Sequence, residues 1–405
     1  MYRSLERDGH EVRAVATEPS HAGCFDSLVH KVPDWRAELP WVGPDGLILF
    51  ERVGVGAVQE ELRREGYQVI GGSTFGDRLE YDRAYGQSVL RDAGLNIADV
   101  HGFESAPQAA EWLRAHPGRF VLKYHNNARA TFVGDHRAGL DVLFQLGRGP
   151  QGPVLLMPYL DGVEVGVGAY FDGTRFLRPA CIDFEHKRFF NGEMGEMTGE
   201  MGTLVAYPED NRIFEASLAR LEPLFAEAGH VGYVNLNMIA NEQGLWPLEF
   251  TCRFGIPGFA ILAPLQTAGW GDLFARMLAR NAARFPASAD WSVGICLTVP
   301  PFPQQLPDAL PEDDPPLFYH AEPEAEEAAH YHLADVRLEA GQLFARRRTG
   351  YAICVTGTGP TVEDAQREAT ARARNVTAPN LRWRTDIGDR FLEGEGERLR
   401  CLGWL

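Results

Sequence analysis

The sequence contains no apolar run that approaches the length of a membrane-spanning helix, which needs about 18 residues. Its first residues, MYRSLERDGHEVR, are too charged for a secretory signal peptide. We therefore expect no membrane partner and a cytoplasmic location.

Cysteine is scarce and scattered, with six residues and no C-x-x-C pair. In a chain of this length, such usage is typical of reduced thiols and not of a disulfide framework or a zinc site. Cysteine usage therefore also favours a cytoplasmic compartment.

Positive charge is in deficit, because 39 lysines and arginines face 56 aspartates and glutamates, for a net charge of −17. A phosphate backbone repels such a chain, so we expect no nucleic-acid partner. Arg346–Arg348 form a short basic run, which we interpret as a solvated strand end or loop.

The remaining composition is that of a globular protein, with 45% hydrophobic and 23% charged residues. The chain of 405 residues is long enough for roughly two to four domains and a large core. We expect small-molecule partners and a monomer or homodimer.

The first eighty residues alternate between helical and strand patterns. A helix is predicted at 2–9, buried strands at 45–50 and 67–72, and an amphipathic helix between those strands that ends at Gly66. This alternation predicts a small parallel sheet. A doubly wound domain normally opens with a strand and a glycine turn, so either these precede the printed sequence or the domain is reduced.

The stretch DFEHKRFFNGEMGEMTGEMG, at 183–202, combines three consecutive cations with an acidic, glycine-rich run. Its glycine content predicts neither a helix nor a strand, and it is too long for a tight turn. We therefore expect a flexible loop here, followed by a helix at 209–228.

Polar side chains alternate along two predicted strands between 231 and 252. Asn235 and Asn237 share one face of the first strand, and Glu249, Thr251 and Arg253 share one face at the end of the second. If the strands pair as a hairpin, their oxygen donors suit Mg²⁺ with nucleotide phosphates, and the guanidinium suits a phosphate oxygen. A solvated polar face remains the alternative.

Two further positions stay ambiguous on pattern alone. Lys123, in the strand FVLKY, either extends from a half-buried strand to water or contacts a phosphate. Glu164 follows the apolar run LLMPYLDG and is either a surface charge or a ligand-binding carboxylate.

Together these motifs, in this order, resemble the ATP-grasp fold. The run EHKRFFNGEMGEMTGEMG resembles the segment of glycinamide ribonucleotide synthetase that reads DHKR, a glycine-acid loop and TGGMG. LEFTCRFGIPG resembles that family's LEFNxRFGDPE, and GYAICVTGTGPTVEDAQREATARA resembles part of its C-terminal domain. The resemblance covers nearly the whole chain.

The resemblance implies an α/β (α+β multidomain) protein with the ATP-grasp fold. Its expected parts are an N-terminal parallel α/β domain at 1–80, a central domain at 81–117 and 181–292, an ATP lid at 118–180, and a small β-rich C-terminal domain at 293–405.

The resemblance also implies an ATP-dependent carboxylate–amine ligase that works through an acyl phosphate, with Mg²⁺ or Mn²⁺ as the metal. Lys123 would hold ATP phosphates, and Glu164 the ribose hydroxyls. The segment expected to contact adenine comprises Met157, Pro158, Tyr159 and Leu160.

The same resemblance assigns the metal and substrate residues. The implied metal ligands are Glu249, Asn237 and Thr251, and Arg253 would lie on the acyl phosphate. His186, Lys187 and Arg188 would flank the carboxylate and the phosphoryl group. The residues expected to fold over the substrate are Glu185, Glu193, Thr198, Gly199 and Met201.

Four departures from the family pattern motivate the main functional hypothesis. Thr251 replaces an asparagine ligand, and Ile256–Gly258 replaces Asp-Pro-Glu. The lid run 124–134 lacks a second lysine, and Arg129 is the candidate substitute. In the N-terminal region, FERVGVG replaces a Gly-Pro-Glu motif. We therefore predict a ligase with an altered amine acceptor that lacks a 5-phosphate. The alternatives are a genuine phosphoribosylamine–glycine ligase and a non-catalytic ATP-binding protein.

Overall fold

The computed structural model describes residues 1–124, 131–150, 152–255, 257–304 and 313–405. Arg129 and Ile256, which were singled out in the sequence, lie outside these residues. Within the described residues, no helix is long and apolar enough to span a membrane. None of the six cysteines forms a disulfide, as the sequence predicted.

The N-terminal region confirms the predicted parallel α/β pattern. Strand β3 pairs in parallel with β4, and helix α3 connects them; β1 pairs in parallel with β2. Helices α4 and α5 are separate because Asp82 leaves helical geometry after α4 and its side chain caps α5. The bounds are α1 (Tyr2–Arg7), β1 (Arg13–Ala14), β2 (His30–Lys31), α2 (Leu39–Val42), β3 (Leu47–Leu49), α3 (Gly56–Arg64), β4 (Gln68–Ile70), α4 (Thr74–Tyr81) and α5 (Arg83–Asp92).

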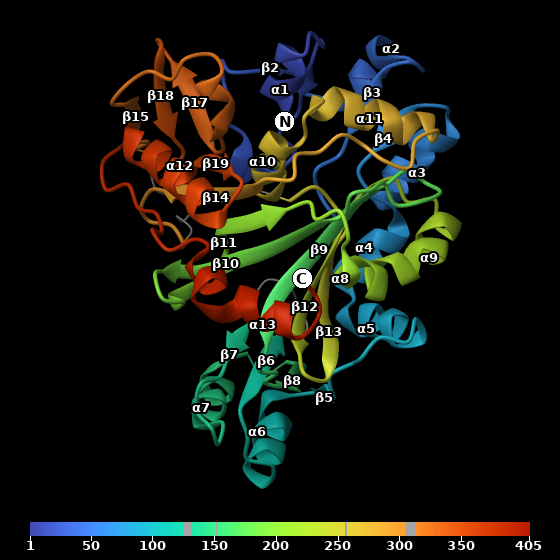
Figure 1. Cartoon of the computed structure of the whole chain (residues 1–405), viewed down its shortest axis with the longest axis vertical. Coiled ribbons are helices and arrows are strands. Elements are labelled where there is room, and N and C mark those ends of the chain that lie inside the picture. The colour runs from blue at the N-terminus through green and yellow to red at the C-terminus, as the bar shows by residue number, and fades with distance from the viewer. Residues whose placement is uncertain (125–130, 151, 256, 305–312) are drawn as a thin grey trace.

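A small four-stranded sheet projects from the lower end of the molecule (Figure 1). Its strand order is β5-β8-β6-β7, and α6 and α7 pack on it around a separate core that includes Leu113, Leu122 and Leu156. The bounds are β5 (His101–Phe103), α6 (Ala106–Ala115), β6 (Phe120–Tyr124), β7 (Phe132–Val133), α7 (Leu140–Arg148) and β8 (Val154–Pro158).

This sheet does not coincide with the lid boundaries of 118–180 predicted above. Strand β9 (Val163–Phe171) lies within those boundaries but pairs in the large sheet, while β5 and α6 lie outside them and belong to the small sheet. Strand pairing therefore bounds the small domain at β5 and β8.

An eight-stranded sheet forms the body of the protein, in the order β13-β12-β9-β10-β11-β14-β19-β16. Its last three strands come from the region predicted as a separate C-terminal domain, so that region shares the main sheet. The remaining strand bounds in this sheet are β10 (Cys181–Phe190), β11 (Met194–Ala206), β12 (Gly232–Asn241), β13 (Gly244–Thr251), β14 (Trp291–Thr298), β16 (Tyr331–Leu333) and β19 (Tyr351–Gly359).

The stretch 183–202 is a hairpin of β10 and β11, not the flexible loop that its glycine content predicted. The prediction was wrong because the glycines fall mainly at the turn and in irregular pairing. Gly192 and Gly195 have φ of +68° and +82°, which a glycine adopts without strain. Apolar and polar side chains alternate from Ile182 to Glu185, and the pairing with β11 shifts register on both sides of Arg188.

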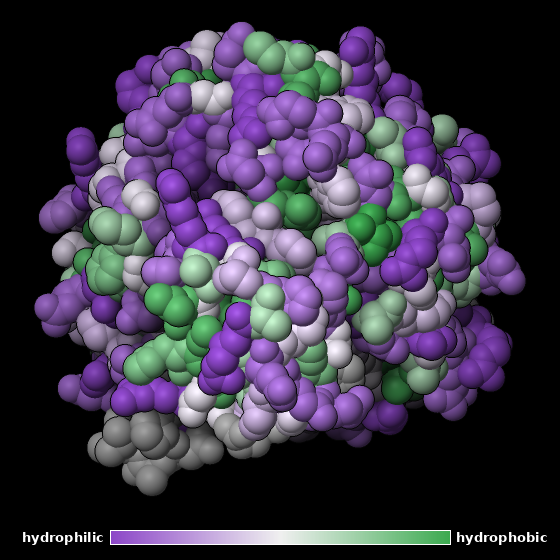
Figure 2. All heavy atoms as spheres, turned by 90° about the horizontal axis from the view of Figure 1, so that it is seen from below, coloured by the Kyte–Doolittle hydropathy of each residue, from purple (hydrophilic) through white to green (hydrophobic). Residues whose placement is uncertain are grey.

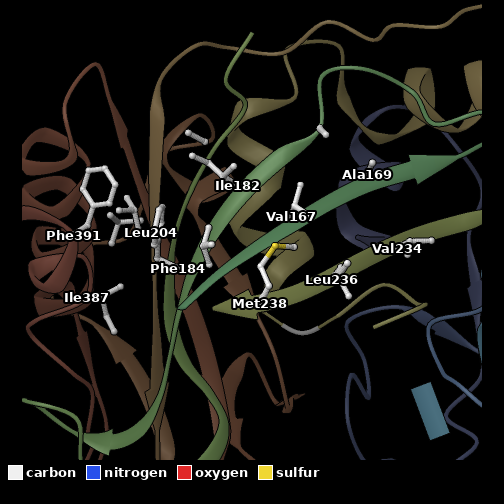
Figure 3. Close-up of a cluster of buried hydrophobic side chains, with 14 of the residues drawn as sticks. Val167, Ala169, Ile182, Phe184, Leu204, Val234, Leu236, Met238, Ile387 and Phe391 are labelled. Carbon is white, nitrogen blue, oxygen red and sulfur yellow. The ribbon is translucent and has the colours of Figure 1, made fainter. Parts of the chain in front are cut away.

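One face of the large sheet is apolar, and the other carries both a row of polar residues, called the polar face, and a second hydrophobic cluster that includes Val205 and Tyr233. Val167, Phe184, Leu204 and Leu236 lie together on the apolar face, and Phe391 from the C-terminal segment packs against them (Figure 3). The rings of Phe184 and Phe391 meet edge to face, with centroids 4.9 Å apart. Burial of this face fixes which side chains of each strand face the other way.

Shorter elements complete the fold. The predicted helix at 209–228 is interrupted at Ser217, whose φ and ψ of −129° and −92° are not helical. The remaining bounds are α8 (Arg212–Ala216), α9 (Glu222–Glu227), α10 (Gly258–Leu262), α11 (Gly269–Ala279), β15 (Pro316–Tyr319), β17 (Val336–Glu339), β18 (Gln342–Ala345), α12 (Val362–Asn375), β20 (Val376–Thr377) and α13 (Gly396–Cys401). Seen from the end that carries the small sheet, the surface is mainly hydrophilic with separate hydrophobic patches (Figure 2).

Candidate active site

The polar face of the large sheet brings the predicted hairpin residues together. Strands β12 and β13 pair as an antiparallel hairpin, with Asn237 opposite Glu249 and Asn235 opposite Thr251. On the other side of β12, Gly166 of β9 lies opposite Asn237, and Asp183 of β10 lies opposite Gly166. One row across four strands therefore contains a carboxylate at each end.

Two glycines of β9 leave room for side chains on this face. A Cβ at Gly166 would lie 2.0 Å from Oδ1 of Asp183, and one at Gly168 would lie 1.8 Å from the hydroxyl of Tyr233. Any larger residue would displace these groups. The glycines thus allow polar side chains from neighbouring strands to lie directly over β9.

Lys187 lies at the centre of a group of charged residues, the charged cluster, which also contains Glu164, Glu185 and Glu249. Its Nζ lies 2.9 Å from Glu185, 3.4 Å from Glu164 and 3.5 Å from Glu249. Burial alone would lower the pKa of Lys187, but these three carboxylates raise it well above its usual value. Lys187 is therefore a permanent cation on a face dominated by anions.

Two more cations approach Glu249. Arg83 of α5 lies 3.1 Å from its Oε2. Burial raises the pKa of Glu249, but Lys187, Arg83 and Lys123 outweigh it and lower the pKa to about 2. Burial, with Arg83, lowers the pKa of Lys123 to about 8. The three cations can neutralise phosphate oxygens as well as this carboxylate.

The donor set at Glu249 and Asn237 fits a hard divalent cation. Nδ2 of Asn237 donates to Glu164 at 2.8 Å, which orients the amide and fixes its oxygen as an acceptor. A carboxylate, an amide oxygen and phosphate oxygens from a nucleotide are the ligands that Mg²⁺ prefers. Thr251 lies one residue pair further along the hairpin, opposite Asn235.

The predicted adenine segment begins at the end of β8, the strand that pairs with β6 opposite Lys123. In the small sheet, Lys123 lies opposite Leu155, and Pro158 lies opposite Phe120. Tyr159 donates its backbone N–H to Arg119, whose guanidinium stacks on the tyrosine ring at 3.4 Å. Of the remaining segment residues, Met157 is buried, and Leu160 packs against the cluster that contains it.

Glu164 was predicted to bind the ribose hydroxyls, and in the structure its carboxylate contacts residues of the charged cluster. Its Oε1 accepts from Asn237 and lies within ion-pair distance of Lys187. The ribose assignment stays a prediction.

His186 is not part of this cluster. It lies on the opposite face of β10 from Lys187, is 1% exposed, and accepts a hydrogen bond at Nε2 from the backbone of Gly388. Burial, with Arg390 and Arg384, lowers the pKa of His186 to about 3. The sequence argument placed three consecutive residues at one site because it did not recognise a strand, in which neighbours point to opposite faces.

Other predicted residues have contacts of a different kind. Arg253 pairs with Glu80 at 3.0 Å. Arg188 donates to the carbonyl of Gly195 at 2.8 Å, and Glu193 pairs with Arg384 at 2.7 Å. Each of these partners is a protein group, and each arginine has further N–H donors beyond the contact given.

The other residues expected to fold over the substrate lie on β11. Thr198 donates its hydroxyl to the carbonyl of Lys187 at 2.8 Å and so braces the strand that carries that lysine. Gly199 lies near the hydroxyl of Tyr351, and Met201 is fully buried beside Phe189. Met201 is therefore a core residue in this structure, while Thr198 stabilises the backbone at Lys187.

Arg384 fixes the hairpin to the C-terminal segment. Its side chain is 1% exposed and donates to both carboxylate oxygens of Asp386, to Glu193 and to the carbonyl of Arg188. This guanidinium bridges three partners in a fixed planar geometry, which an ammonium group cannot reproduce.

We therefore expect Arg384→Lys to lower the free energy of unfolding by about 2–4 kcal/mol, because buried hydrogen bonds to charged groups are lost. Urea unfolding and limited proteolysis of the hairpin turn would measure the change. Arg400→Lys, at an exposed ion pair with Glu397, is the matched control and should have little effect. An unchanged unfolding curve for the Arg384 variant would contradict the bridging role.

Sequence reasoning missed several residues of the site. Arg83 gives no local signal, because it lies on a helix 166 positions before its partner Glu249. Asp183, which accepts from Asn235 at 2.7 Å, could have been found from the two-residue alternation of Asp183, Glu185 and Lys187. Glu80, which holds Arg253, also has no pattern in the sequence.

The fold and this site together define an ATP-grasp enzyme of the ligase class. Residues 81–259 match the family model for the phosphoribosylglycinamide synthetase ATP-grasp (A) domain. The structure is similar to that of a biotin carboxylase–β,γ-ATP complex from Campylobacter jejuni, with a TM-score of 0.60 and 10% identity over 99% of this chain and 93% of that one.

Within the ATP-grasp superfamily, the chain resembles glycinamide ribonucleotide synthetase, also named phosphoribosylamine–glycine ligase. It is 28% identical to that ligase from a Nostoc species over 82% of this chain and 81% of the relative. It is 25% identical to the Lactococcus lactis ligase over 96% and 91%. The Thermotoga maritima ligase structure has a TM-score of 0.71 and 19% identity, covering 95% of both chains.

Proposed function

We propose that this protein uses ATP and Mg²⁺ to join the carboxylate of glycine to the amine of phosphoribosylamine. The observation that carries the proposal is the extent of the similarity. Phosphoribosylamine–glycine ligases align with up to 96% of the chain, far beyond the ATP-grasp domain at 81–259. Regions outside the nucleotide site are thus retained together with it.

This similarity favours the second hypothesis from the sequence over the first. No finding supports an altered acceptor, and the ligase class argues against a non-catalytic ATP-binding protein. The motif departures at the N-terminal region and after Arg253 were weighted too heavily, since relatives of only 20–28% identity are expected to differ at many positions.

The reaction needs activation because a carboxylate is a poor electrophile. A carboxylate oxygen attacks the γ-phosphorus of ATP, the bond to the bridging oxygen breaks, and ADP leaves. The acceptor amine then attacks the acyl carbon, phosphate departs with the electron pair of its bond to that carbon, and the amine loses a proton. Positioning and neutralisation of charge supply most of the rate enhancement.

The cations of the charged cluster suit this transfer. Lys123 of β6 in the small sheet and Lys187 of β10 both lie close enough to Glu249 to lower its pKa. With Arg83, they would neutralise the γ-phosphoryl group as it moves to the carboxylate. Mg²⁺ held by Glu249 and Asn237 would supply additional charge on the phosphate oxygens; Mn²⁺ has the same preference for oxygen ligands.

A large cavity of about 1120 Å³ supports a phosphorylated acceptor. It lies between α1 and the C-terminal region, and Phe259 and Ala260 of α10 form part of its wall. Arg3 and Arg7 of α1 also line it, together with the carboxylates of Glu6, Glu51 and Glu322. The two arginines are the candidate cations for a 5-phosphate in this cavity.

The proposal is tested by supplying ATP, Mg²⁺, glycine and freshly generated phosphoribosylamine and measuring ADP and the amide product. We expect turnover on the order of 10 per second, the median for enzymes. ADP release that needs glycine but yields no amide with phosphoribosylamine would contradict the proposed acceptor. A panel of amines without phosphate, followed by mass spectrometry, would then reveal an altered one.

A further inference from the structure

Two cysteines lie directly opposite each other in the large sheet. Cys296 of β14 pairs with Cys354 of β19 in the antiparallel register. Residues in this relation point to the same face of a sheet, and their Cα atoms are about 4.5 or 5.5 Å apart. Both separations fall within the range of about 4.4–6.8 Å that a disulfide requires. Strand pairing therefore places the two side chains where their sulfur atoms can form a bond.

The two thiols are also in contact. The thiol of Cys296 hydrogen-bonds to that of Cys354, and this bond, with burial, raises the pKa of Cys296 well above its usual value. Cys181, in the same sheet, differs in both respects, because it lies opposite Gly168 and contacts the hydroxyl of Tyr233. Register and side-chain contact thus single out Cys296 and Cys354 as a pair.

The large cavity gives access to one thiol of the pair. Cys354 lines this cavity of about 1120 Å³, together with Ala260 and His332. Cys296 is only 2% exposed and is not among the described residues that line it. Hydrogen peroxide is only slightly larger than a water molecule, which has about 30 Å³ in the liquid, so the cavity admits it readily. A small oxidant in the cavity therefore meets Cys354 before Cys296.

We propose that Cys296 and Cys354 form a reversible disulfide, in which a peroxide in the large cavity oxidises Cys354 and Cys296 completes the bond. This modification site is additional to the proposed function and does not depend on which substrates the enzyme joins. Both thiols are reduced in the structure. The disulfide is therefore a second state of the protein and not part of its basic framework.

The chemistry has two steps and balances with hydrogen peroxide as the oxidant. The thiolate sulfur of Cys354 attacks one peroxide oxygen, the O–O bond breaks, and hydroxide leaves with its electron pair, which gives a sulfenic acid. The sulfur of Cys296 then attacks that of Cys354, the S–O bond breaks, and a second hydroxide leaves. The two thiol protons convert the two hydroxides to water. Peroxide gains two electrons, and the thiol pair loses two.

The surroundings of the pair make the second step slow. The thiolate is the reactive form of a cysteine, and the raised pKa of Cys296 keeps this thiol mostly protonated near neutral pH. Cβ atoms of opposite residues are about 4.5–5.5 Å apart, whereas a disulfide needs about 3.5–4.5 Å, so the strands must approach by up to about 1 Å. We therefore expect the bond to form over minutes to hours, within the usual range for disulfides.

The test treats the intact protein with hydrogen peroxide for increasing times, alkylates the remaining thiols and analyses an unreduced digest by mass spectrometry. We expect a peptide pair joined through Cys296 and Cys354, which dithiothreitol separates. The bond closes a loop that contains β15, β16, β17 and β18. Because such a link restricts the unfolded chain, the midpoint of thermal unfolding should rise by at least about 2 °C in the oxidised protein and return after reduction.

Two variants test the order of the steps. Cys296→Ala should stop at the sulfenic acid of Cys354, which dimedone traps as a stable adduct. Cys354→Ala should give neither the disulfide nor an adduct at Cys296. Cys401→Ala is the matched control, since it removes the exposed cysteine and should leave the cross-link unchanged. Peroxide should raise the unfolding midpoint of this control but not that of the other two variants.

The wild-type digest decides the proposal even if a variant fails to fold. Cys401 serves as an internal standard for delivery of the oxidant, because it is exposed. A protein whose Cys401 is fully oxidised while Cys296 and Cys354 remain free thiols would overturn the proposal. Pairing of Cys354 with a different cysteine would also overturn it, and a dimedone adduct at Cys296 in place of Cys354 would reverse the assigned order. None of these outcomes depends on whether the enzyme turns over.

Discussion

Replacing Glu249 with glutamine is expected to lower kcat by about 10²–10³-fold, the cost of removing one stabilising group from a charged transition state. The substitution preserves the shape of the side chain but removes the charge that would hold Mg²⁺. It also leaves Arg83 and Lys187 without the carboxylate that each contacts in the structure. The requirement for Mg²⁺ should therefore rise together with the loss of kcat.

The measurement is ADP release as a function of Mg²⁺ concentration, accompanied by circular dichroism to show that the variant is folded. Glu242→Gln is the matched control, since Glu242 lies in the turn of the same hairpin and pairs with Arg398 at the surface. Near-normal ADP release by Glu249→Gln would refute the assignment of Glu249 as the metal ligand.

Replacing Gly168 with alanine is expected to lower the free energy of unfolding by about 3 kcal/mol, the upper end of the usual cost of overpacking a core. The added Cβ would lie 1.8 Å from the hydroxyl of Tyr233. That ring cannot move aside easily, because it packs between Tyr170 and Phe254 with centroids 5.2 and 6.3 Å away. The backbone of β9 must shift instead.

Thermal unfolding and urea titration would measure this loss. Gly147→Ala is the control, since a Cβ at that position in α7 meets no atom within 4 Å. Alanine is favoured over glycine in a helix by about 1 kcal/mol, so this second variant should be at least as stable as the wild type. A Gly168→Ala protein that unfolds at the wild-type midpoint would show that β9 and β12 adapt freely.

The two predictions concern different properties of one polar face. The Glu249→Gln variant tests the charge on this face through kcat. The Gly168→Ala variant tests, through the free energy of unfolding, the space that lets side chains lie over β9. Both depend on strand register, since Asn235 lies opposite Gly168 on one side and Thr251 on the other. A shift of one residue in any of these strands would turn its polar residues toward the hydrophobic core.

The hydrogen bonds of Arg384 connect the β10–β11 hairpin of this face to the C-terminal segment. Arg384 donates to the carbonyl of Arg188 in β10 and to the carboxylate of Glu193 in the turn between β10 and β11. Asn191 also pairs with Thr385 in the same region. The strand that carries Lys187 is therefore fixed at its far end by residues almost 200 positions later in the chain.

The sequence by itself determined the features that depend on local periodicity. Alternation along 231–252 predicted a hairpin with Asn237 and Glu249 on one face, and the structure confirms that pairing. The early alternation of helix and strand predicted parallel pairing of β3 with β4, which is also confirmed. The order of motifs further indicated the ATP-grasp fold, because each motif occupies a fixed place in that topology.

Only the tertiary structure decided which charges meet and which faces are buried. Glycine content hid the β10–β11 hairpin, so the sequence placed His186 beside Lys187 although the pleat turns them to opposite faces. Arg83 reaches Glu249, and Asn235 reaches Asp183, only because the folded sheet brings distant segments together. Such contacts depend on register and on a missing Cβ in a neighbouring strand, and neither leaves a signal in the residues that make the contact.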